Sequence, residues 1–185
     1  MTERIETPGL ILRTLNEKDV PGLLDFFERN SKFFKPWIPE YEKNYYTCDY
    51  QILKLEYEKK LKEEGIEFRF YIFDKNIPER IIGNVSVSNI IRGVLQSAFL
   101  GYSVDEKENK KGIATDAIKR IIEFTFDELK LHRLEANVIP ANTASIRVLE
   151  KLNFIKEGYS EKYLKINGRW QDHLRYALVN KNYPD

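Results

Sequence analysis

The feature that most constrains this fold is a strand, a polar turn and a strongly amphipathic helix in direct succession. Residues from Ala98 to Val104 have the pattern of a strand, and those from Gly112 to Leu129 the pattern of a helix. The helix carries one apolar face, made of Ala114, Ala117, Ile118, Ile121, Phe124 and Leu129. A helix with one such face must bury it, and the strand before it predicts a sheet as the partner.

Further strand and helix patterns surround this unit. The other expected strands are Leu10–Arg13, Phe68–Asp74, Ile81–Ile91, Leu134–Val138, Ile155–Ile166 and Trp170–Val179, and the other expected helices follow Asn16 and cover Cys48–Glu64 and Asn142–Leu152. Asn167-Gly168 predicts a tight hairpin turn. We therefore expect an α+β (mixed α/β) fold. One domain, 1–185, would hold a mostly antiparallel twisted sheet of six to seven strands with helices on both faces.

Composition excludes several classes of protein. The chain has 30 Lys and Arg against 29 Asp and Glu, a net charge of +1, so no direct nucleic-acid partner is expected. Cys48 is the only cysteine and His132 and His173 are the only histidines, which argues against a disulfide and a metal site and suits the cytoplasm. No stretch approaches the roughly 18 apolar residues of a membrane span, so no membrane partner is expected.

An aromatic segment interrupts the regular pattern between residues 30 and 46. It carries Phe33, Phe34, Trp37, Tyr41, Tyr45 and Tyr46 around two prolines. Two interpretations stay open, because aromatic side chains in an irregular segment can form a binding surface or cover the core.

The turn before the long helix has the properties of an anion site. The first amides of a helix lack internal partners and lie at the positive end of its dipole, so a diphosphate can accept hydrogen bonds from them. Gly112 allows close approach to the backbone, and Lys110 and Lys111 add positive charge. The alternative is an ordinary exposed helix start. The P-loop and dinucleotide fingerprints are absent.

Three segments resemble the GCN5-related N-acetyltransferases (GNAT). The turn is similar to the family's Gln/Arg-x-x-Gly-x-Gly/Ala motif through Gly112 and Ala114, with Asn109 in place of Gln or Arg. The run from Asn142 to Phe154 resembles the family's Asn-x-x-Ser segment. Glu157-Gly158-Tyr159, Asn167-Gly168-Arg169-Trp170-Gln171-Asp172-His173 and the opening Thr7-Pro8-Gly9-Leu10-Ile11-Leu12-Arg13 resemble the ribosomal-protein-alanine (RimJ/RimL-like) branch.

The resemblance implies a cofactor, a reaction and a set of site residues. A primary amine would attack the thioester of acetyl-CoA directly, with no metal. The residues implied to contact acetyl-CoA are Tyr102, Val104, Asn109, Lys110, Lys111, Gly112, Ile113, Ala114, Thr115, Asn142 and Ser145. A backbone N–H at Val104 would stabilise the oxyanion, and Ser145 would protonate the departing thiolate. Helix-start capping is the alternative role for Ser145.

The general base is less clear from the sequence. Some relatives carry a Glu where this chain has Leu164. Asp172 is a catalytic candidate because alternation places it on the apolar face of its strand, although a structural hydrogen bond to the backbone or to a tyrosine would also explain it. His173 falls on the opposite face and is expected to be exposed. Glu135 is a further candidate that would act through water.

The expected acceptor is the N-terminal α-amine of a protein, as in ribosomal-protein-alanine acetylation. At pH 7 roughly 10% of α-amines are neutral against about 0.04% of lysine amines, so weak base catalysis favours the former. Phe34, Trp37 and Tyr159 are expected to wall the acceptor groove. The alternatives are a small-molecule amine (a polyamine, an amino acid or an antibiotic) as acceptor, or a non-catalytic acyl-CoA-binding regulator. Monomer and homodimer both stay open.

Overall fold

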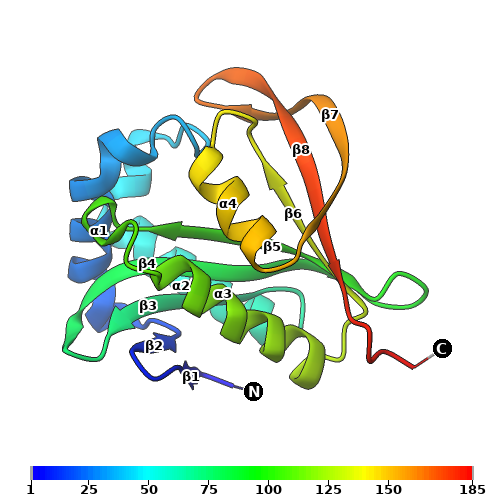
Figure 1. The fold of residues 1–185 in the computed structure, drawn as a ribbon. Helices are drawn as coiled ribbons and strands as arrows, with labels where there is room; N and C mark the ends of the chain where they lie inside the picture. The colour runs from blue at the N-terminus through cyan, green and yellow to red at the C-terminus, as the bar shows by residue number, and fades with distance from the viewer. Residues whose placement is uncertain (1, 185) are drawn as a thin grey trace.

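The computed structural model describes residues 2–184, which form one layered α/β structure around a single sheet (Figure 1). The strands are β1 (Arg4–Glu6), β2 (Leu10–Arg13), β3 (Phe68–Asp74), β4 (Ile77–Ile91), β5 (Ser97–Val104), β6 (Arg133–Val138), β7 (Ile155–Ile166) and β8 (Arg169–Val179). The α-helices are α1 (Val20–Phe34), α2 (Cys48–Glu63), α3 (Ile113–Glu123) and α4 (Thr143–Lys151). Short helical turns are η1 (Glu17–Asp19), η2 (Lys43–Tyr46), η3 (Glu106–Glu108) and the π-turn η4 (Phe124–Glu128).

The sheet confirms the expected fold class. Its strand order is β1-β2-β3-β4-β5-β6-β8-β7, and every neighbouring pair is antiparallel except β5 and β6. It has eight strands in residues 2–184, one more than the pattern indicated. The additional strand, β1, has three residues and only one buried side chain, Ile5, so it leaves almost no alternation to detect.

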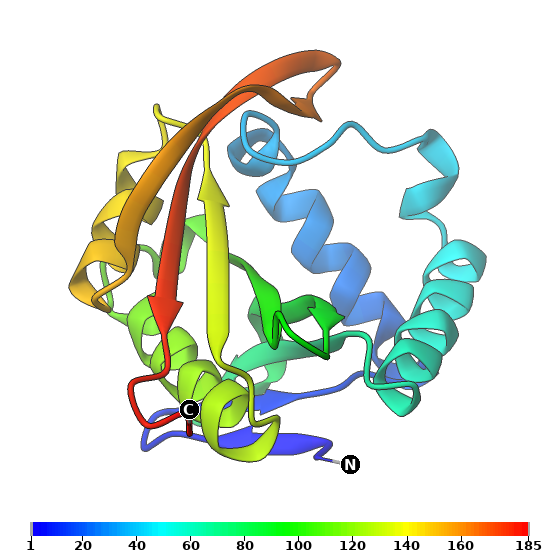
Figure 2. The same cartoon turned by 90° about the vertical axis from the view of Figure 1, so that its right-hand side faces the viewer.

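Helices cover both faces of the sheet, as expected (Figure 2). The α3 and α4 side holds the larger core, where Ala117, Ile118 and Ile121 pack on strand residues such as Phe70. The α1 and α2 side holds a smaller core around Leu23, Phe26, Tyr71 and Phe73. No helix in residues 2–184 has both the length and the apolarity needed to cross a membrane.

Two local features follow from particular residues. The expected helix to Leu129 keeps α-geometry only to Glu123 and then widens into the π-turn η4, where the Thr125 hydroxyl donates to the Ile121 carbonyl at 2.7 Å. At the β7–β8 turn, Asn167 and Gly168 both have positive φ, +46° and +75°, as the predicted hairpin dipeptide requires.

The parallel pair in the middle of the sheet separates along its length. Only Ser97–Phe99 of β5 are paired with Arg133–Glu135 of β6. From Leu100 onward the two strands diverge, while β5 stays paired with β4 as far as Val104. The divergence opens a gap in the sheet between the start of α4 and the end of α1, and the candidate site lies there.

Candidate active site

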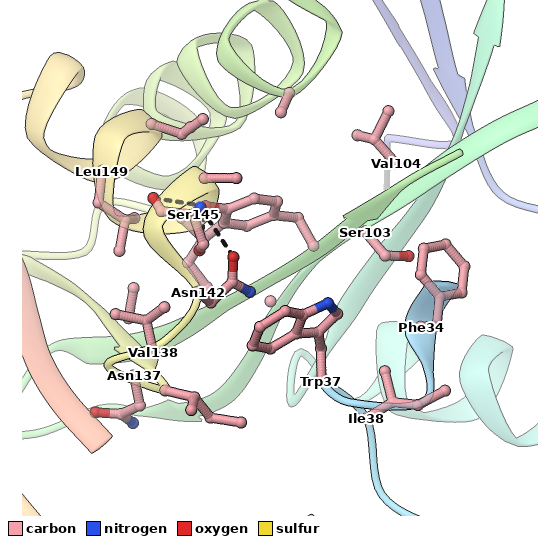
Figure 3. Close-up of a pocket in the computed structure, with 18 of the residues that line it drawn as sticks. Phe34, Trp37, Ile38, Ser103, Val104, Asn137, Val138, Asn142, Ser145 and Leu149 are labelled. Carbon is pink, nitrogen blue, oxygen red and sulfur yellow. Dashed lines mark hydrogen bonds between the residues drawn. The ribbon is translucent and has the colours of Figure 1, made fainter. Parts of the chain in front are cut away.

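A cavity of about 270 Å³ occupies the gap between β5 and β6 (Figure 3). It is lined by Phe33, Phe34, Trp37, Ile38, Leu100, Gly101, Tyr102, Ser103, Val104, Asn109, Ala114, Ala136, Asn137, Val138, Ile139, Asn142, Ala144, Ser145, Val148, Leu149 and His173. One side is formed by the start of α4, with Asn142 and Ser145, and the other by the end of α1 and the residues after it, with Phe34 and Trp37. Six of the residues expected from the sequence at the acetyl-CoA site line this cavity: Tyr102, Val104, Asn109, Ala114, Asn142 and Ser145.

The free edge of β5 presents backbone amides to the cavity. The Asp105 N–H points to β4, where it donates to the Ile82 carbonyl at 2.9 Å. Successive amides of an extended strand point to opposite sides, so the Val104 N–H points to the β6 side, where no strand is paired with it. This is the orientation that an oxyanion donor needs.

Tyr102 and Ser145 form a hydroxyl pair across the cavity. The Tyr102 OH lies 2.7 Å from Ser145 Oγ and 3.3 Å from the Ser145 carbonyl oxygen. Burial raises the pKa of Tyr102 to about 12, so its phenol stays protonated at neutral pH. The pair can therefore pass a proton toward a group beside Ser145.

Asn142 is the N-cap of α4. Its side chain accepts a hydrogen bond from the Ser145 backbone N–H at 3.1 Å. The capping role is thus performed by Asn142, and the Ser145 hydroxyl is left for its contact with Tyr102.

The turn before α3 forms an open cradle of amides. Lys110 and Gly112 have positive φ, +65° and +86°, and no side chain caps the first turn of α3. A Cβ added at Gly112 would meet no atom within 4 Å, so the space beside Gly112 is open. Unpartnered amides beside open space fit a diphosphate group.

Two polar side chains of this turn already have partners within the turn, whereas the amides at the start of α3 do not. Asn109 donates to the Glu106 carbonyl at 3.1 Å, within its own turn. Lys111 Nζ pairs with the Glu108 carboxylate at 2.9 Å. The anion-binding capacity therefore rests mainly on the amides of Ile113, Ala114 and Thr115 at the start of α3.

A buried ion cluster ties this turn to α1. The Asp105 carboxylate, 2% exposed, accepts from Arg29 at 2.7 Å and from Arg80 at 3.0 Å. Burial raises the pKa of Asp105, but the hydrogen bonds from Arg29 and from the Lys107 N–H outweigh it, so the pKa lies below the ordinary value of 3.8. The Asn30 side chain also accepts from the Glu106 N–H at 2.9 Å. One helix thus carries both this anchor and, one turn later, a wall of the cavity.

The aromatic segment performs both roles that the sequence left open. Phe34 and Trp37 line the cavity. Tyr45 is buried and stacks on Tyr41 with ring centroids 3.9 Å apart, so this part covers the α1 and α2 core.

The β7–β8 hairpin places its predicted residues differently. Tyr159 and Asp172 do not line the cavity; Asp172 accepts from the Tyr159 hydroxyl and, at 2.8 Å, from the Lys162 N–H. These contacts are the structural explanation considered for Asp172, and a catalytic role for it stays a prediction, as does an acceptor contact by Tyr159. The carboxylate of Glu135 is held by Arg133 and Arg175, each at 3.0 Å.

The expectation that His173 is exposed is wrong. His173 is 3% exposed and lines the cavity. Alternation assigned it correctly to the face opposite the apolar one, but alternation cannot tell whether another segment covers that face. Here the residues after α1 reach across the sheet to the same cavity.

Sequence reasoning also missed Ser103 and Asn137. Ser103 accepts a hydrogen bond from the Asn84 side chain at 2.7 Å, and the side-chain amide oxygen of Asn137, Oδ1, is buried without a partner. These strand residues line the cavity only because β5 and β6 separate, and the sequence pattern of neither strand indicates that separation. Within residues 2–184 no group of three or more His, Cys, Asp or Glu side chains is arranged to hold a metal ion.

Comparison with protein families gives one match that covers most of the chain. Residues 9–155 match the family model described as the acetyltransferase (GNAT) domain. Among curated proteins, the chain is 42% identical to the probable N-acetyltransferase YjcK of Bacillus subtilis, over 92% of this chain and 94% of that protein.

Two solved structures have a similar fold over at least 95% of this chain. The ribosomal-protein-S5-alanine acetyltransferase of Vibrio fischeri has a TM-score of 0.92 and 34% identity, covering 98% of this chain and 99% of that chain. RimJ of Mycobacterium smegmatis, in complex with CoA-disulfide, has a TM-score of 0.87 and 27% identity, with coverages of 95% and 84%.

Proposed function

Because the chain belongs to the acetyltransferase (GNAT) family and is an N-acetyltransferase, we propose that it moves an acetyl group from acetyl-CoA to the N-terminal α-amine of a protein. The single observation that carries the proposal is the cavity in the sheet, with the amide cradle of α3 and the hydroxyl pair at its edge. The similarity to a ribosomal-protein-S5-alanine acetyltransferase supports a ribosomal protein as the acceptor.

Acetyl-CoA fits this site by its chemistry. The open amides at Ile113–Thr115 suit the diphosphate, and the lining between Leu100 and Val104 suits the extended arm that ends in the thioester. RimJ, a relative with the same fold, is known in complex with CoA-disulfide. When bound, acetyl-CoA supplies an acetyl group already activated as a thioester.

Residues around the cavity can stabilise the oxyanion and protonate the thiolate that form during acetyl transfer. The Val104 N–H stabilises the negative oxygen, and one such donor contributes about 3–4 kcal/mol to lowering a barrier. Ser145 donates its hydroxyl proton to the departing thiolate, and Tyr102, protonated at neutral pH, restores it. Phe34 and Trp37 hold the acceptor on the other side of the cavity.

The free-thiol assay with an acceptor panel tests the proposal. Acetyl-CoA is offered with a peptide that starts with alanine, the same peptide blocked at its N-terminus, spermidine and free alanine. We expect thiol release with the open peptide and little with the blocked peptide or spermidine. Release with spermidine alone assigns a small-molecule acceptor, and tight acetyl-CoA binding without release for any amine assigns a regulator.

A further inference from the structure

His173 is the one buried titratable group at the cavity that the mechanism above does not use. His173 is buried, with 3% of the residue exposed, yet it lines the same cavity as Ser145 and Val104. The ring packs edge-on against Tyr163 with centroids 5.6 Å apart, which restricts its rotation. A buried polar ring at a reaction cavity needs either a full set of partners or a task.

One hydrogen bond sets the protonation pattern of the ring. His173 Nδ1 lies 3.0 Å from the Gln171 carbonyl oxygen. A carbonyl can only accept, so Nδ1 carries the hydrogen and, in the neutral ring, Nε2 keeps its lone pair. Nε2 has no hydrogen-bond partner within residues 2–184, and the residue lines the cavity, so Nε2 is available to a group that enters it.

The other candidate bases in this region are already engaged. The Glu135 carboxylate is shared between Arg133 and Arg175, and Asp172 is held by Tyr159 and by the Lys162 N–H outside the cavity. Neither carboxylate lines the cavity.

We propose that His173 Nε2 is the proton acceptor for the attacking amine, a role that rests on the proposed acetyl transfer but not on the identity of the acceptor. The amine nitrogen forms its bond to the acetyl carbon and loses one proton to Nε2. The carbon–sulfur bond breaks, and the sulfur takes the Ser145 proton. The His173 proton leaves to solvent, and the Tyr102–Ser145 pair regains one, so one proton passes from amine to thiol for each acetyl transferred.

The test compares matched variants of the full chain with an alanine-starting peptide at pH 7. His173→Ala removes the imidazole and leaves space for added imidazole. His173→Gln has a side chain of similar size without a basic nitrogen. His173→Asn keeps a hydrogen-bond donor near the Gln171 carbonyl. His132→Ala is the control, because the chain's other histidine lies outside the cavity, against Tyr183. Turnover is measured by thiol release and acetyl-CoA affinity by calorimetry.

We expect kcat/KM to fall about a hundredfold in His173→Gln and His173→Asn, the low end for loss of a general base. Affinity for acetyl-CoA stays within twofold, and His132→Ala matches the wild type. Added imidazole restores turnover in His173→Ala, where it has room to enter, and has no effect in His173→Gln.

Each other outcome overturns the inference. Turnover of the Gln and Asn variants within threefold of wild type removes His173 from the reaction, and a parallel loss of acetyl-CoA affinity makes it a binding or packing residue. A loss in His173→Ala that imidazole leaves unchanged also contradicts it. If the wild type acetylates another amine instead of the peptide, the α-amine proposal fails while the same variants, assayed on that amine, still decide the role of His173.

Discussion

Replacing Gly112 by Glu or by Gln separates two effects at the amide cradle: the backbone strain of a side chain at positive φ and the charge of that side chain. The φ of +86° at Gly112 costs any other L-residue about 1–2 kcal/mol, and both substitutions bear that cost equally. Neither meets a steric barrier, because a Cβ there has no atom within 4 Å. The two variants therefore differ only in the charge that they place in front of the first amides of α3.

That charge is expected to act in opposite directions on stability and on binding. A carboxylate at a helix N-terminus stabilises the free protein by about 0.3–1 kcal/mol, so the Glu variant should melt slightly above the Gln variant. Against one phosphate charge about 4 Å away, the same carboxylate costs roughly 1 kcal/mol in water and 4 kcal/mol near a protein surface. Acetyl-CoA should thus bind Gly112→Glu roughly fivefold to several hundredfold more weakly than Gly112→Gln.

Thermal unfolding without ligand and calorimetric titration with acetyl-CoA measure both effects. Gly93→Glu serves as the control, since Gly93 also has a positive φ, +70°, and open space, but lies in the β4–β5 connection away from the cavity. If the Glu and Gln variants bind acetyl-CoA equally, or if Gly93→Glu weakens binding as much, the phosphates do not lie on these amides.

Three further predictions follow from the same contacts. Ser145→Ala should lower kcat by roughly a hundredfold, as loss of a general acid does, and leave KM for acetyl-CoA almost unchanged in steady-state assays; unchanged kcat removes Ser145 from the mechanism. Tyr102→Phe should lower the plateau of the pH–rate profile but leave the pH at which the rate rises unchanged. The reason is that, with a pKa of about 12, only about one Tyr102 in a thousand is ionised at pH 9. A shift of that pH in the variant would assign the rise to ionisation of Tyr102. Asp105→Asn should cost about 3 kcal/mol of unfolding free energy, the low end for breaking a buried ion pair, or roughly 6–12 °C in Tm, whereas Glu157→Gln, which breaks the exposed pair with Arg133, should cost less than about 1 kcal/mol; equal losses refute the anchoring role of Asp105. Because folding lowers the pKa of Asp105 below 3.8, the stability that this carboxylate contributes is present above its unfolded pKa and is lost as the pH falls further. The Tm values of wild type and Asp105→Asn should therefore converge in acid.

Local chemistry explains why parts of this site were predictable from the sequence. Gly112 and the Asn167-Gly168 turn occupy positive φ, a requirement that residue type reveals directly. The start of the helix at Asn142 was predictable because a short polar side chain is strongly preferred at a helix N-cap, the position that Asn142 takes in α4.

The missed features depend on contacts between distant segments. The separation of β5 from β6 after Phe99 turns Ser103 into a cavity residue, and nothing in the sequence of β5 itself marks it. His173 was expected to face solvent, yet it is buried and lines one cavity with Trp37 and Ile38, which lie more than a hundred residues away in the chain. Period-two alternation gives the face of a strand but not its neighbour.

The most direct test of the account is to locate the acetyl group on an acceptor that offers both kinds of amine. A peptide that begins with alanine and carries an internal lysine is incubated with acetyl-CoA and the wild-type enzyme at pH 7, and the product is fragmented in a mass spectrometer. The account predicts one acetyl group, on the α-amine. An acetyl group on the lysine side chain, or an unmodified peptide under conditions where spermidine is acetylated, would contradict it.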